Sequence, residues 1–69
     1  MKIYELAKIV PTMQKIIIDT ISEKNYGRKT LFKGVMVDQA NKDDEYGNAR
    51  VTSIKTTEEY ISTLIITVD

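Results

Sequence analysis

Hydrophobic positions near the start of the chain repeat with a helical period. Five apolar residues follow the spacing that lines one face of a helix: Ile3, Leu6, Ala7, Val10 and Met13. This pattern predicts a short helix over residues 2–10. Pro11 is expected to end it, because proline disfavours helical geometry in the residue before it.

Most of the remaining chain consists of β-branched runs separated by polar stretches, a pattern typical of strands. Four strands are predicted, at residues 15–22, 30–37, 49–56 and 60–68. Short polar connections at 23–29 and 57–59 predict two antiparallel hairpins. The polar stretch 38–48 predicts a loop with room for one helical turn beginning at Asp38. The expected order is α-β-β-loop-β-β: one small α+β domain, residues 1–69, with a short amino-terminal helix packed on a four-stranded, mainly antiparallel sheet.

A single short helix covers only one face of such a sheet. Strand alternation places a second set of apolar side chains on the opposite face: Ile17, Phe32, Met36, Ile61 and Ile65. An uncovered apolar surface of this size favours contact with another molecule. We expect a homodimer through this self-association face. The alternatives are a partner protein on the same face, or strand phases that differ from the simple alternation.

The chain has no histidine, no cysteine and no tryptophan among its 69 residues. It therefore lacks the side chain that titrates near neutral pH, and it lacks a thiolate for nucleophilic, redox or zinc chemistry. Its three glycines are scattered and form no phosphate-binding loop. We expect no catalytic residue, no metal and no cofactor, and we interpret the protein as non-enzymatic.

The acidic stretch does not fit a calcium-binding loop. If Gly47 takes the sixth position, Lys42 takes the first position and Ser53 the twelfth, where the pattern requires acidic ligands. A solvated turn is the simpler interpretation.

Charge is distributed unevenly although the net charge is zero. Residues 1–34 hold seven basic and three acidic side chains, a balance of +4, and residues 35–69 hold three and seven, a balance of −4. Either the two halves interleave into a mixed surface, or the molecule has a basic edge and an acidic edge. The candidate acidic partner-binding residues are Asp38, Asp43, Asp44, Glu45, Glu58 and Glu59.

The basic residues suggest an alternative function. Cations interleaved with an aromatic ring are typical of surfaces that bind single-stranded nucleic acid, and this group comprises Lys24, Tyr26, Arg28, Lys29 and Lys33. A sequence pI near 6.2 argues against a dedicated nucleic-acid binder. A purely structural homo-oligomer is a further alternative.

Four segments carry a resemblance to a group of known proteins: MKIYELAKIVP, KIIID, TLFKGVMVD and VTSIKTTEEYISTLIITVD. In their order and style the chain resembles small accessory proteins of phages and integrative mobile elements of Gram-positive bacteria. Some proteins of this kind inhibit host defence nucleases, including CRISPR effectors, by binding them. The resemblance implies a protein partner from the host and carries over no site residue.

These observations lead to one leading expectation about function. The protein would inhibit a host nuclease through an acidic surface that imitates nucleic-acid phosphates. The opening MKIYELAKIV interrupts its apolar run with Glu5 and Lys8, so it resembles neither a signal peptide nor a membrane span. We therefore expect a protein of the host bacterial cytoplasm that makes no membrane contact.

Overall fold

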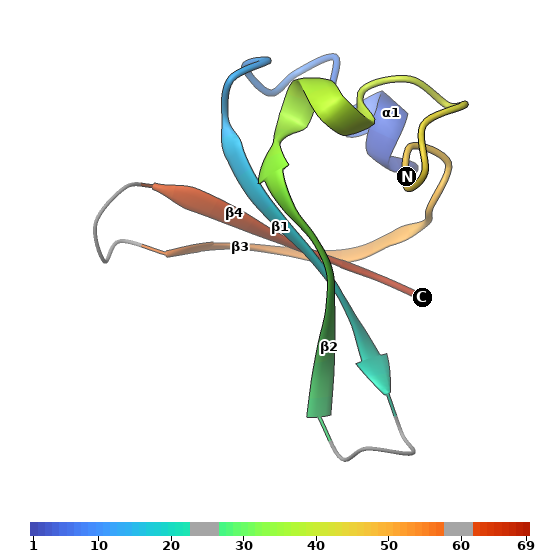
Figure 1. Cartoon of the computed structure of the whole chain (residues 1–69), viewed down its shortest axis with the longest axis vertical. Helices are drawn as coiled ribbons and strands as arrows, with labels where there is room; N and C mark the ends of the chain where they lie inside the picture. Colours follow the sequence, from blue (N-terminus) through green and yellow to red (C-terminus); the bar gives the residue numbers. More distant parts are fainter. Residues whose placement is uncertain (23–26, 58–61) are drawn as a thin grey trace.

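The computed structural model describes residues 1–22, 27–57 and 62–69 (Figure 1). Four strands form one sheet: β1 (Lys15–Ser22), β2 (Gly27–Val35), β3 (Val51–Thr57) and β4 (Thr63–Val68). A helical turn, α1 (Ile3–Leu6), precedes them, and a 3-10 turn, η2 (Met36–Gln39), follows β2. The α+β class and the four strands agree with the sequence prediction.

The strands are arranged in the order β2-β1-β4-β3. Both predicted hairpins are present, because β1 pairs with β2 and β3 pairs with β4 in antiparallel fashion. The central pair, β1 with β4, is parallel, so the description "mainly antiparallel" holds for two of the three pairings. The two hairpins extend in different directions from this central pair (Figure 1).

The helix is much shorter than the predicted 2–10. Its start is fixed by the Glu5 carboxylate, which accepts the Lys2 backbone N–H at 2.9 Å. After Leu6 the backbone N–H groups of residues 8 and 9 bond to carbonyls three residues earlier, so the α-helical pattern ends before Pro11. Met13 is 72% exposed and does not belong to the buried helical face.

The second strand begins and ends earlier than the predicted 30–37. The backbone N–H of Met36 donates to Gln14 O and that of Val37 donates to Thr12 O, which draws the chain away from the sheet and into η2. The helical turn that we expected to begin at Asp38 therefore begins at Met36.

The hydrophobic core lies between one face of the sheet and the elements α1 and η2. Seven buried side chains form it: Ile3, Leu6, Ile16, Ile18, Met36, Ile66 and Val68. Phe32, Tyr46 and Leu64 are partly buried and pack against this cluster. β1 contributes alternate isoleucines, as period-2 alternation predicts.

Two members of the predicted self-association face belong to this core instead. Met36 is 1% exposed, and Phe32 pairs with Ile18, whose side chain is fully buried. Apolar residues occur on both sides of β2. The pattern of β2 alone therefore did not determine which of its sides lies on the same face of the sheet as Ile17. Ile17 and Ile65 do lie on the opposite face, whereas Ile61 is outside the described residues.

Candidate functional site

The sheet face turned away from the core is the first candidate site, and we call it the open face. Its central row crosses all four strands in register, from β2 to β3: Lys33, Ile17, Ile65 and Lys55. The two isoleucines are half-buried and the two lysines at the edge strands are exposed. Because α1 and η2 pack on the core side, neither covers this row.

A polar row lies beside the central row and contains a buried carboxylate. Asp19 and Thr67 are partners across the parallel β1–β4 pair and are 5% and 3% exposed. The Thr67 hydroxyl donates to Asp19 Oδ1 at 2.6 Å, and Arg28 Nη1 lies 3.6 Å from Asp19 Oδ2. Since both carboxylate oxygens have partners, this group has a structural role in joining the two hairpins.

The open face carries an excess of positive charge. Lys15 and Arg28 join the two lysines of the central row, since Lys15 precedes Ile17 by two residues and Arg28 pairs with Ile21. Among the residues of β1, β2, β3 and β4 that the structure describes, Asp19 is the only carboxylate, and it is paired with Arg28. The three lysines have no ion-pair partner among the described residues.

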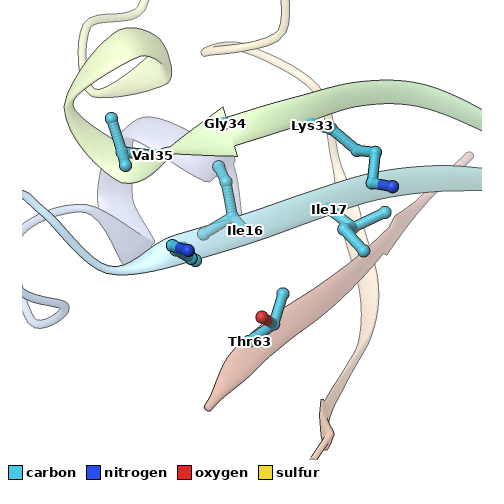
Figure 2. A pocket seen from close by; sticks show the side chains of 7 residues that line it. Ile16, Ile17, Lys33, Gly34, Val35 and Thr63 are labelled. Atoms are coloured by element: carbon cyan, nitrogen blue, oxygen red, sulfur yellow. The ribbon is translucent and has the colours of Figure 1, made fainter. Parts of the chain in front are cut away.

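A shallow hollow of about 320 Å³ lies at one end of this face. It is lined by Lys15, Ile16, Ile17, Lys33, Gly34, Val35 and Thr63. Figure 2 shows the Lys33 side chain extended over β1, with Ile17 and Thr63 facing each other across the gap between β1 and β4. Aliphatic side chains therefore form the lining between two ammonium groups.

The predicted nucleic-acid-binding cluster is divided by the sheet. Arg28 and Lys33 lie on the open face, but Lys29 pairs with Thr20 and points to the core side. Lys24 and Tyr26 fall outside the described residues. In the described part of the strands the one aromatic residue is Phe32, which packs against the core, so no ring accompanies these cations on the open face.

The second candidate is the acidic loop, residues 38–48. Asp38, Asp43 and Glu45, three of the predicted partner-binding residues, are exposed. Asp44 has a different role, because its Oδ2 accepts the Asn41 backbone N–H at 2.9 Å and closes a turn. Glu58 and Glu59, the other two predicted members, are outside the described residues.

Buried contacts hold the acidic loop in one shape. The Oε1 of buried Gln39 accepts the Tyr46 N–H at 2.7 Å, and the Tyr4 N–H donates to Gly47 O at 2.8 Å. A Cβ at Gly47 would overlap the Asn41 carbonyl, so the turn requires glycine. The pKa of the Tyr46 phenol is raised from its ordinary value of 10.0. Burial is the largest cause and a hydrogen bond to Glu45 is the second.

The described residues were compared with the requirements of a metal site and of a membrane-spanning helix. Among residues 1–22, 27–57 and 62–69, no group of three His, Cys, Asp or Glu side chains is arranged to hold a metal ion. No helix in these segments has the length and apolar character to cross a membrane. Comparison with models of protein families, with curated proteins and with solved structures finds no match to this chain.

Sequence reasoning did not identify Lys15, Lys55 and Thr63 as residues of the open face. Lys15 could have been found, because it lies two residues before Ile17 on the same strand. Lys55 and Thr63 depend on how β4 aligns with β1 and β3, and no local pattern specifies that register.

Proposed function

We propose that the protein is a non-enzymatic binding protein and that its open face contacts an acidic, partly apolar surface of a partner protein. The central row carries this proposal, because it places Ile17 and Ile65 between two exposed lysines on a face that neither α1 nor η2 covers. Interfaces between proteins commonly combine an apolar centre with a charged rim.

The charge and chemistry of the face favour protein over nucleic acid. Lysines in this arrangement would attract phosphates as well as carboxylates, but single-stranded nucleic acid is usually held by stacking on aromatic rings. In the described part of the open face, isoleucines lie where such aromatic rings would be needed. An acidic protein surface that also presents aliphatic side chains matches both features.

The acidic loop supports a second candidate function. Its exposed carboxylates, Asp38, Asp43 and Glu45, are presented by a turn with fixed hydrogen bonds, so a basic groove could bind them without first ordering the loop. Together with the resemblance to phage and mobile-element proteins, this favours a host nuclease as the partner of the loop.

One capture experiment distinguishes these functions. Tagged protein is incubated with bacterial lysate, with and without nuclease, and the retained partner is quantified for each variant. We expect Lys33→Glu combined with Lys55→Glu to reduce capture of a protein partner by about tenfold or more. Lys33→Glu alone is compared with Lys29→Glu, which makes the same charge change at an exposed lysine of the same strand that points to the core side.

The outcomes separate the three candidates. Equal capture by the open-face variant and the Lys29→Glu control would refute the proposal. Loss only in Asp43→Lys combined with Glu45→Lys would transfer the function to the acidic loop, while Asp44 is left unchanged because it closes the turn. Capture of nucleic acid alone, removed by nuclease, would favour the nucleic-acid alternative.

A further inference from the structure

The hollow beside the central row has the features of a specific anchor site. Ile17 and Val35 are its aliphatic lining residues on the open face, whereas the Ile16 side chain belongs to the core, and its volume of about 320 Å³ lies at the lower end of the range for ligand sites, which is roughly 300–1,000 Å³. The hollow opens to solvent beside the exposed Lys15 and Lys33, so a side chain from another molecule can reach it.

Its position in the sheet fixes which charges surround it. Lys15 and Lys33 lie on neighbouring strands in diagonal positions, because Lys15 pairs with Val35 and Lys33 pairs with Ile17. Both lysines line the hollow and both side chains are exposed. No carboxylate of the described residues lies within ion-pair distance of either ammonium group.

From this geometry we propose that the hollow receives an anchor of the partner protein, an aliphatic side chain flanked by carboxylates, as in a Glu-Leu-Glu segment. The aliphatic group would pack on Ile17 and Val35, and the carboxylates would meet Lys15 and Lys33. This inference rests on the proposed function and narrows it to one end of the open face.

The aliphatic side chain and the carboxylates of the partner segment contribute differently to binding. Apolar burial is the dominant favourable term in most protein association. The binding energy is concentrated at a few well-packed side chains in desolvated pockets. Charge complementarity supplies orientation and speeds association. A segment with only an aliphatic side chain would leave the two lysines without partners, and a segment with only carboxylates would leave Ile17 and Val35 uncovered.

A matched set of three synthetic peptides tests the inference. They share flanking residues and differ at the centre: Glu-Leu-Glu, Glu-Ser-Glu and Lys-Leu-Lys. Each is titrated to millimolar concentration into ¹⁵N-labelled protein. We expect the Glu-Leu-Glu peptide to shift the amide signals of Ile17, Lys33 and Thr63, and we expect the Glu-Ser-Glu peptide to bind about tenfold more weakly.

Variants identify the site of binding. Lys15→Glu and Lys33→Glu should each weaken the Glu-Leu-Glu peptide by about tenfold, and Lys29→Glu should leave its affinity unchanged. Absence of a shift with this peptide, equal binding of all three peptides, or shifts restricted to Ser53 and Ile54 on β3 would overturn the anchor.

The failure of the anchor and the failure of the proposed function give different results. If the peptides do not bind but capture of the partner still depends on Lys33 and Lys55, the open face is the binding surface and the anchor inference is wrong. If capture is also insensitive to these lysines, the proposed function is wrong as well.

Discussion

Asp19 is a carboxylate that the fold buries in the middle of a basic face. It is held by the Thr67 hydroxyl from β4 and lies near Arg28 from β2, so three strands meet at one side chain. A shift of one residue between β1 and β4 would move Thr67 to the other face and leave Asp19 without its donor. This hydrogen bond therefore helps to select the parallel register.

Replacing Thr67 with valine tests that role. The change keeps the shape of the side chain but removes the donor, so a buried carboxylate oxygen loses its partner. We expect the free energy of unfolding to fall by about 1–3 kcal/mol. Chemical denaturation measures it, and Thr56→Val, at an exposed position on β3, is the control, with a change within about 0.5 kcal/mol. Equal stability of both variants would contradict the register role.

Individual buried residues were predictable where the alternation had a single interpretation. Ile3 and Leu6 follow the helical spacing, and Leu64, Ile66 and Val68 follow the alternation of β4; all of them contribute to the core. Phe32 was assigned to the wrong face because its neighbour across the hairpin depends on the register, which a strand with apolar residues on both sides does not specify.

Among the elements, the acidic loop shows how a polar segment acquires a defined structure. The Tyr46 ring lies 6.4 Å from the Phe32 ring, measured between centroids, and the Tyr46 backbone N–H donates to Gln39. Composition predicted a solvated loop, and it gave no sign that Gln39 and Gly47 would be buried. The carboxylates of this loop extend from a packed base.

The pH dependence of the loop follows from the raised pKa of Tyr46. The folded state holds the phenol proton more tightly than the unfolded state, so this contribution to stability is present below pH 10.0 and is lost as the pH rises through the folded pKa. We expect Glu45→Gln to lower the pKa of Tyr46 only in part, because burial is the first cause. Tyrosine ¹³C NMR titration measures this, and an unchanged pKa would show that Glu45 has no role.

The strands illustrate the limit of local patterns at the level of elements. β1 was predicted with its correct bounds, and both hairpins were predicted, because the residues that pair are close in sequence. The parallel pairing of β1 with β4 joins segments 48 residues apart, from Lys15 to Thr63. Nothing in either strand alone distinguishes this order from the alternative orders of the two hairpins.

At the scale of the whole molecule, the charge of the open face affects how copies can associate. The homodimer stays a prediction, and the charge of the open face predicts how its stability would depend on salt concentration. Pairing two open faces would bring the lysines of both copies together, so salt should strengthen such a dimer by screening their repulsion. An acidic partner would instead bind more weakly as salt increases.

Sedimentation velocity of the pure protein at low and high salt tests this salt dependence. We expect any dimer formed through the open face to increase with salt, and Lys33→Glu to strengthen it at low salt more than the control Lys29→Glu does. A dimer that weakens with salt, or that responds equally to both variants, would place the interface elsewhere on the molecule.

The central position of β4 has a consequence for synthesis in the cell. Until residues 63–68 emerge from the ribosome, β1 has only β2 as a neighbour, and an isolated hairpin is marginally stable in water. At about 5–20 residues per second, the 48 residues from Lys15 to Thr63 take roughly 2–10 seconds to add. Once the isoleucine-rich β1 has left the ribosome, it exposes an unpaired edge until β4 follows, so a nascent chain that stalls before β4 would be a target for chaperones or proteases.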